Sequence, residues 1–149
     1  MPEWFVVVTV VVVGLMVGVE FSVAVFVNPI FNRLANNAGL EARGDGARVL
    51  GRVMPFWYIG SLVLAAAWTF QAWGRPQALT VAAATALLVV SVVLSVTLLV
   101  PINAQVARWS AEGVPADWRR QVGRWEGFHY VRVGLIVAAF ALLVSAGIM

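Results

Sequence analysis

The sequence contains no cysteine and no lysine, and it has a single histidine. Without cysteine the chain can form no disulfide, no thiolate metal site and no cysteine nucleophile. The absence of lysine excludes Schiff-base chemistry on a lysine amine. One histidine cannot build a His-rich zinc, copper or non-haem iron site, and a b-type haem would need a methionine or a partner chain as its second axial ligand. We therefore predict no metal and no cofactor.

Charged residues are also scarce. They make up 11% of the chain against 62% hydrophobic residues, whereas soluble domains have about 25% charged and 45–50% apolar residues. A helix of about 20 apolar residues crosses the hydrocarbon core of a bilayer, and four runs are of that length: 4–27, 53–73, 76–100 and 129–149. We predict an all-α fold, a single domain of residues 1–149 that forms a bundle of four transmembrane helices. The first run lacks a basic start and a small-residue cleavage site, so we expect a retained helix and not a signal peptide.

The arginines predict the orientation of the bundle. Nine of the ten lie between the first and second runs, between the third and fourth, or just inside the fourth, and only Arg75 lies elsewhere. The positive-inside rule then places both long loops in the cytoplasm and both termini outside, in the cytoplasmic membrane. Arginines beside apolar spans are typical of contact with lipid headgroups. We expect membrane lipids as partners, and no nucleic acid.

The runs are arranged as two tandem helical hairpins, each made of a span, a basic loop and a second span. The link between the hairpins, Gly74-Arg75-Pro76, is so short that the second and third spans must be neighbours. The segment Asn28-Pro29-Ile30-Phe31-Asn32 follows the first span, and Pro101-Ile102-Asn103 follows the third, 72 residues later. Either an old duplication or two independent helix stops would explain this echo.

The two loops have different patterns. In the first, Asn36-Asn37-Ala38-Gly39 and Gly44-Asp45-Gly46 favour turns and predict partly irregular structure. In the second, a helical stripe follows the start signal Val114-Pro115, with its members at Trp118, Val122, Trp125 and His129. We expect this piece to extend the fourth helix into the cytoplasm, with its aromatic side chains at the membrane interface. The third span is expected to end at Pro101.

Two charged residues lie inside the spans, Glu20 and Arg132. A charge near the bilayer centre costs about 2.5–3.5 kcal/mol, so we expect Glu20 to be buried in protein close to Arg132. The carboxylate is then either a structural partner of the arginine or a catalytic group. Trp125 and His129 share a helix face with Arg132. His129 is the only side chain that ordinarily exchanges protons near neutral pH, and we expect it at the cytoplasmic mouth of a pocket, as a base or as a hydrogen-bonding residue.

Small residues mark possible helix contacts. Gly14, Gly18 and Ser22 form a stripe that allows another helix, or another protomer, to approach closely, so a homo-oligomer or a membrane-complex partner is expected there. Ser91 and Ser95 could hydrogen-bond across the bundle.

With these residues in view, the chain resembles the family of small four-helix membrane proteins, mostly of unknown function, that includes the anthrone oxygenases of aromatic polyketide pathways. The resemblance covers nearly the whole chain and is carried by GVEFSVAVFVNP (18–29), VPIN (100–103) and RWEGFHYVR (124–132). The last segment is similar to the family's Trp, His-or-Asn, Arg signature. The resemblance implies a catalytic set of His129, Arg132 and Glu20 and a substrate-binding set of Asn103, Trp125 and Asn28.

The family's oxygenases are thought to act on electron-rich anthrones without metal or flavin. A base that removes a proton from a phenol or a benzylic carbon yields a carbanion able to react with oxygen, so the protein supplies a base, oxyanion donors and a dry pocket. The resemblance implies such an enzyme, with His129 as base and a lipophilic aromatic substrate that is either oxygenated or cyclised. The alternative is a non-catalytic subunit of a membrane complex; a channel or transporter is less favoured, because the spans offer little polar pathway. A pocket enclosed by Glu20, Asn103, His129 and Arg132 would favour the enzyme, and a solid interior would favour the subunit.

Overall fold

The computed structural model describes residues 2–35 and 37–149, and every regular element in them is helical. The elements are α1 (Glu3–Ser22), a π-helical turn η1 (Val23–Val27), α2 (Asn28–Arg33), α3 (Ala38–Gln71), α4 (Ala78–Leu94), a second π-helical turn η2 (Ser95–Leu99), α5 (Val100–Glu112) and α6 (Trp118–Gly147). They join into four rods that are long and apolar enough to cross a membrane: Glu3–Arg33, Ala38–Gln71, Ala78–Trp109 and Trp118–Gly147. The predicted bundle of four transmembrane helices is confirmed.

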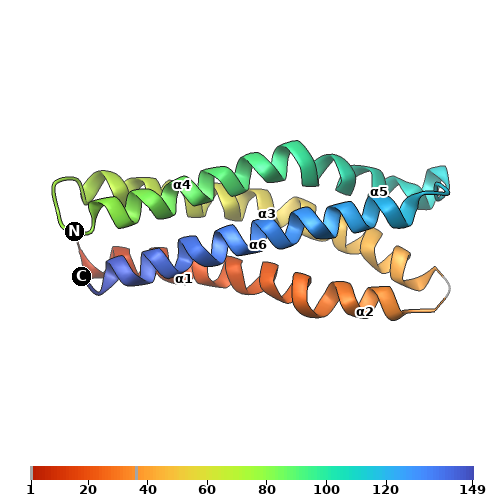
Figure 1. The fold of residues 1–149 in the computed structure, drawn as a ribbon, viewed down its shortest axis with the longest axis horizontal. Helices are drawn as coiled ribbons and strands as arrows, with labels where there is room; N and C mark the ends of the chain where they lie inside the picture. The colour runs from red at the N-terminus through yellow and green to blue at the C-terminus, as the bar shows by residue number, and fades with distance from the viewer. Residues whose placement is uncertain (1, 36) are drawn as a thin grey trace.

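The four rods lie side by side along one long axis, and both chain termini are at the same end (Figure 1). α6 packs against α1 and α4, and α3 packs against α1, α4 and α5. The order around the bundle is therefore α1, α3, α4–α5 and α6, as two tandem hairpins require. The turn between the hairpins contains Gly74 with φ +78°, a left-handed conformation that glycine adopts without steric cost.

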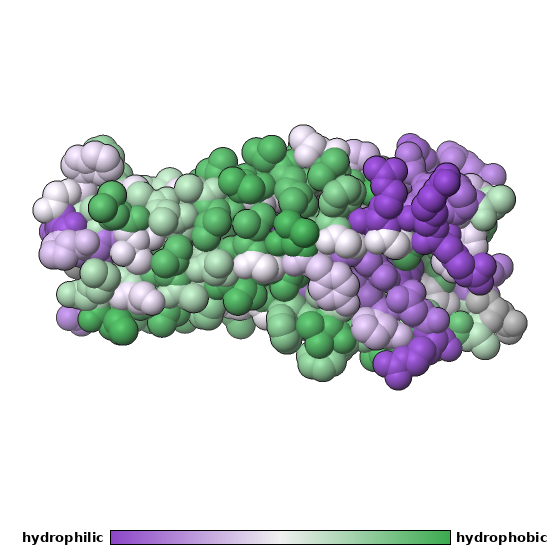
Figure 2. Space-filling view, viewed as in Figure 1, coloured by the Kyte–Doolittle hydropathy of each residue, from purple (hydrophilic) through white to green (hydrophobic). Residues whose placement is uncertain are grey.

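Polarity changes along this axis. Figure 2 shows apolar side chains over most of the length from the end with the termini, while hydrophilic side chains gather at the far end, around α5 and the start of α6. We call these two ends the terminal half and the arginine-rich half. The chain is therefore an integral membrane protein, and the placement of its arginine-rich half in the cytoplasm remains a prediction.

The expectation of partly irregular structure in the first loop is confirmed at Leu34, Ala35 and Asn37, which lie outside any helix, and is wrong for Gly44-Asp45-Gly46. α3 begins at Ala38 and runs without a break through Gly44-Asp45-Gly46. Tertiary packing outweighs the turn-forming tendency here. Gly44 is buried against α5, where a Cβ atom on it would be in ordinary contact, 3.8 Å from the carbonyl oxygen of Val106. Leu40 packs into a small apolar cluster with Val106, Trp109 and Val122. Asn36 lies outside the described residues.

The third rod does not end at Pro101, which corrects a second expectation. η2 precedes Pro101, and α5 continues to Glu112. The N–H of Val100 donates to the carbonyl of Ser95, five residues back, and the N–H of Asn28 donates in the same way to Val23 before Pro29. A π turn widens the backbone where a proline ring would crowd the carbonyl four residues earlier. The two π turns are also 72 residues apart, which favours the duplication.

The second loop agrees with expectation, because α6 begins at Trp118 and runs unbroken to Gly147. The small-residue stripe divides in two. A Cβ atom on Gly14 would lie 2.9 Å from the ring of Phe140, so Gly14 allows α1 to pack on α6 within the chain. Gly18 has no such neighbour within 4 Å. A contact with another protomer through Gly18 and Ser22 remains a prediction.

Candidate functional site

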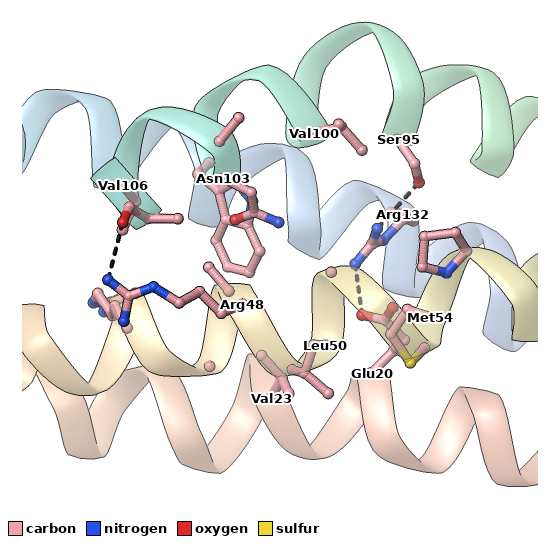
Figure 3. A pocket seen from close by; sticks show the side chains of 18 of the residues that line it. Glu20, Val23, Arg48, Leu50, Met54, Ser95, Val100, Asn103, Val106 and Arg132 are labelled. Atoms are coloured by element: carbon pink, nitrogen blue, oxygen red, sulfur yellow. Dashed lines mark hydrogen bonds and ion pairs between the residues drawn. The ribbon is translucent and has the colours of Figure 1, made fainter. Parts of the chain in front are cut away.

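The arginine-rich half encloses a cavity of about 530 Å³ to which all four rods contribute. Most of its lining is apolar, for example Val23, Leu50 and Met54. Figure 3 shows Glu20 and Arg132 at one end of this space and Arg48 at the other, with Asn103 between them. The polar side chains that line it include Glu20, Asn28, Tyr58, Ser95, Asn103 and Arg132. An apolar space with a few convergent polar groups is the usual form of a small-molecule site.

Arg132 is the central group of the cavity's deep end. Its Nη2 donates to Oε2 of Glu20 at 2.6 Å, and its Nη1 donates to Oγ of Ser95 at 3.1 Å. Its guanidinium carbon also lies 5.3 Å from the centre of the Tyr58 ring, within range of a cation–π contact. Since these partners come from α1, η2 and α3, one side chain of α6 contacts all the other rods. Glu20 is 4% exposed, so the predicted buried pair with Arg132 is confirmed.

His129 does not lie at the mouth of the cavity, where the sequence analysis predicted it. It is completely buried and does not line the cavity, so its expected position at the mouth is wrong. Its ring stacks on Trp125 with centroids 4.7 Å apart, and its Nδ1 lies 3.0 Å from Nη2 of Arg132. Because arginine can only donate, Nδ1 is the acceptor and the ring proton is on Nε2. The shared face of Trp125, His129 and Arg132 is confirmed, and it places His129 behind the arginine.

A second polar cluster closes the cavity toward the arginine-rich end. Arg43, whose side chain is 8% exposed, forms an ion pair with Glu126 and donates to the side chains of Asn28 and Asn32. Asn32 also donates to Glu126 at 3.2 Å. Glu126 therefore pairs with Arg43 and not with His129, although it is three residues from the histidine in sequence. The cluster connects the start of α3 with α2 and α6.

Several buried donors around the cavity have no hydrogen-bond partner among the described residues. They are Nδ2 of Asn28, the Tyr58 hydroxyl, Nε1 of Trp125 and Nε of Arg132, and all four residues line the cavity. An unpaired buried donor typically costs about 1–3 kcal/mol. Native structures seldom leave such groups unpaired unless a water or a ligand completes them. Water, or a bound molecule with acceptor oxygens, could complete these donors.

Five of the six predicted site residues line one cavity: Glu20, Asn28, Asn103, Trp125 and Arg132. Sequence reasoning missed Tyr58 and Arg43. A tyrosine within an apolar span carries little signal, because interfacial aromatic residues are common. Arg43 has the appearance of one more loop arginine, and its burial depends on the unexpected early start of α3. No group of three His, Cys, Asp or Glu side chains that could hold a metal ion occurs in the described part of the chain.

A comparison with known protein families matches residues 47–142 to the family described as anthrone oxygenase. The chain belongs to the anthrone oxygenase family. The match covers more than half of the sequence and includes Asn103, Trp125, His129 and Arg132, whereas Glu20 and Asn28 precede it. No curated protein and no solved structure shows a significant match. In this anthrone oxygenase family member, the pairing of Glu20 with Arg132 is what connects the matched region to the first helix.

Proposed function

We propose that this protein is a membrane-embedded, cofactor-independent enzyme that oxygenates a lipophilic, aromatic polyketide-like molecule such as an anthrone. The observation that carries the proposal is a buried carboxylate and guanidinium pair, Glu20 and Arg132, that opens on an apolar cavity with unpartnered donors. A flat phenolic ring system has the apolar faces and the acceptor oxygens that such a cavity would hold. Family membership supports the same class of substrate.

The base in this proposal is Glu20, in place of His129. The histidine does not reach the cavity, and its Nδ1 accepts from Arg132. The contacts of Arg132 and His129 both fall on Oε2 of Glu20, and the Tyr58 hydroxyl also interacts with this carboxylate. In the proposal, Oε1 takes the proton from the substrate. Arg132 has five N–H donors and uses only part of them on Glu20, Ser95 and His129. Its remaining donors, with the amide of Asn103, would stabilise the oxyanion that develops on the ring carbonyl.

The chemistry balances with molecular oxygen as the oxidant. Glu20 takes a proton from the benzylic carbon of the anthrone, and the resulting carbanion gives its electrons to oxygen, so that a carbon–oxygen bond forms and a hydroperoxide results. Loss of the second benzylic proton breaks the oxygen–oxygen bond. One oxygen atom stays as the new quinone carbonyl and the other leaves as water. A dry cavity favours the first step because the charge-stabilising groups act more strongly without solvent.

The test uses purified protein in lipid nanodiscs with 1,8-dihydroxyanthrone as the probe, under air and under nitrogen. We expect quinone absorbance and oxygen consumption above the protein-free rate under air. Glu20→Gln should lower the protein-dependent rate by about 10²–10⁴-fold, the usual contribution of proton transfer. Arg120→Ala, which removes an exposed ion pair with Asp117 outside the cavity lining, is the matched control and should leave the rate unchanged.

Other outcomes would assign a different function. Conversion of a polyketide-like probe at the same rate under nitrogen would replace oxygenation by proton-driven cyclisation, which uses the same base. Full turnover by Glu20→Gln would remove the carboxylate from the mechanism. No protein-dependent turnover under either gas would favour the non-catalytic subunit.

A second variant tests the unpartnered donors. Tyr58→Phe removes a buried hydroxyl that lies beside the Glu20 carboxylate without a well-formed hydrogen bond. If the substrate accepts from this hydroxyl, KM should rise by up to about tenfold, since a hydrogen bond contributes about 0.5–1.5 kcal/mol, while the free energy of unfolding changes little. A loss of stability with an unchanged KM would show that the hydroxyl is structural.

A further inference from the structure

The exposed residues of the cavity lining come from only two of its walls. On α3 they include Gly51, Pro55 and Ile59, and on the opposite wall they are Val96, Val100 and Ala104 of η2 and α5. Each set has a spacing of four residues, so each forms one edge along its helix. The lining residues of α1, η1, α2 and α6 are buried or half-buried. The cavity therefore has its opening between α3 and the η2–α5 wall.

The cavity is closed at both ends of the bundle. Toward the arginine-rich end, Leu40, Val106, Trp109 and Val122 form an apolar cluster. Arg48 also bridges the two walls by donating to the carbonyl of Ala107 at 3.1 Å, as Figure 3 shows at one end of the cavity. Toward the terminal end, the main core of the bundle fills the space. The opening of the cavity therefore faces the side of the bundle, between α3 and the η2–α5 wall.

The surroundings of this opening are apolar along most of its length, and the exposed Arg48 and Arg52 flank it only at the Gly51 end. Large exposed side chains flank it on both walls, among them Phe56 and Val63 on α3 and Val93 on α4. In a chain with four membrane-spanning helices, such side chains face lipid. Both edges also contain very small residues. A Cβ atom on Gly51 would meet nothing within 4 Å, and Ala104 has only a methyl group.

We propose that the edges Gly51, Pro55 and Ile59 on one side and Val96, Val100 and Ala104 on the other form a lateral window, through which a lipophilic ring-shaped ligand enters the cavity from the bilayer and not from water. The class of ligand rests on the proposed function, but the window itself does not. A membrane route suits a molecule that partitions into lipid, because the ligand never crosses the charged end of the protein. With this route, the ligand does not need to pass the polar cluster of Arg43, Glu126, Asn28 and Asn32, which closes the cavity toward the arginine-rich end.

The absence of cysteine makes a labelling test possible without background. A single Val23→Cys places a thiol on the η1 wall of the cavity, away from the window edges. Val25→Cys, two residues further on an exposed position of the same turn, is the matched control. Each variant in liposomes is treated with N-(1-pyrenyl)maleimide, which partitions into lipid and is itself a flat polycycle, or with a disulfonated stilbene maleimide, which stays in water. We expect the pyrenyl reagent, and not the disulfonate, to label the cavity cysteine.

Closing the window should then slow this reaction. Gly51→Trp or Ala104→Trp, combined with Val23→Cys, should lower the pyrenyl labelling rate by about tenfold or more, where tenfold corresponds to about 1.4 kcal/mol of added barrier. Gly60→Trp, at a site on α3 that is equally free of neighbours but does not line the cavity, should have no effect. None of the three tryptophans should change the labelling of Val25→Cys. Two blocking variants on different walls keep the test valid if one of them fails to fold.

Three results would overturn the window. They are equal labelling by the disulfonate, an unchanged rate in both folded blocking variants, and no labelling of the cavity cysteine while Val25→Cys reacts. Because the readout involves no turnover, a failure of the oxygenase assay with successful labelling would remove the proposed function and leave the window in place.

Discussion

The terminal half and the arginine-rich half are built from the same four rods, yet the cavity described above lies in the second. In the terminal half, Met16, Trp68, Ile136 and Leu143 are fully buried and pack without a break. In the arginine-rich half, three of the four rods contain a proline within the helix. The cavity therefore coincides with the part of the bundle in which the backbone is irregular, and not with a lack of apolar side chains.

Each proline acts in its own way. Pro29 and Pro101 follow π turns, which widen the first and third rods where they line the cavity. Pro55 cannot donate to the carbonyl of Gly51, and both residues lie at the cavity. The fourth rod has no proline within α6, and it supplies the side chains that hold the others together. The site thus lies where three rods contain prolines and where Arg132 contacts all of the other rods.

The largest expected effect concerns the contacts of Arg132 with the other rods. Arg132→Met leaves the carboxylate of Glu20 buried and unpaired, and we expect the free energy of unfolding to fall by about 3–5 kcal/mol. The double variant Glu20→Gln with Arg132→Met removes both charges and should recover most of the loss, without restoring turnover. Equilibrium unfolding in mixed detergent micelles, followed by tryptophan fluorescence, measures both values.

Arg132→Lys refines this prediction, because it keeps the charge but loses the planar fork that reaches Glu20 and Ser95 together. It should lie between the wild type and Arg132→Met in stability. If Arg132→Met unfolded as late as the wild type, the pair would not hold the rods around the cavity.

His129→Ala is expected to have the next largest effect. The side chain is fully buried against Trp125 and accepts from Arg132, so its removal leaves a void and an unpaired donor. We expect a loss of about 2–4 kcal/mol in the same unfolding assay. His129→Asn offers an acceptor and should recover part of the stability. An interfacial catalytic base would behave in the opposite way, with stability unchanged and activity lost in both variants.

Much of the fold could be predicted from the sequence, because bilayer physics leaves few choices. The sequence has four apolar runs long enough to cross a bilayer, and these determine the four spans. Glu20 and Arg132 are opposite charges inside the spans, and each would be costly in lipid without the other as a partner. The depth of His129 could not be predicted in this way. Its position at the start of an apolar run suggested the membrane interface, but α6 begins eleven residues earlier, at Trp118, and Trp125, Arg132 and Glu20 of α1 contact the ring. Helix contacts between distant segments decide such burial, and periodicity within one segment does not report them.

Pro55→Ala tests the role of the prolines directly. Alanine restores the N–H that can bond to the carbonyl of Gly51, so α3 should straighten and the free energy of unfolding should increase by about 1–2 kcal/mol, part of the penalty of about 3 kcal/mol for proline in a helix. A straighter α3 should narrow the window and slow pyrenyl labelling of Val23→Cys. If stability increased with no change in the labelling rate, the proline would not shape the opening.

The smallest expected effect lies at the surface of the arginine-rich half, where Asp117 precedes α6. Hydrogen bonds from the side chains of Gln121 and Arg120 hold the pKa of Asp117 below its usual range. A pKa that is lower in the folded state stabilises the fold above the unfolded pKa of about 3.9, and this stability is lost as the pH falls through the folded pKa. Asp117→Asn should therefore have a Tm slightly below the wild type at neutral pH, and the difference should disappear in acid. Gln121→Ala removes the hydrogen bond that lowers the pKa of Asp117 most and should reproduce most of this change. A Tm difference for Asp117→Asn that persists in acid would mean that the effect at the start of α6 does not come from the ionised carboxylate, and that the arginine-rich half does not depend on this surface pair.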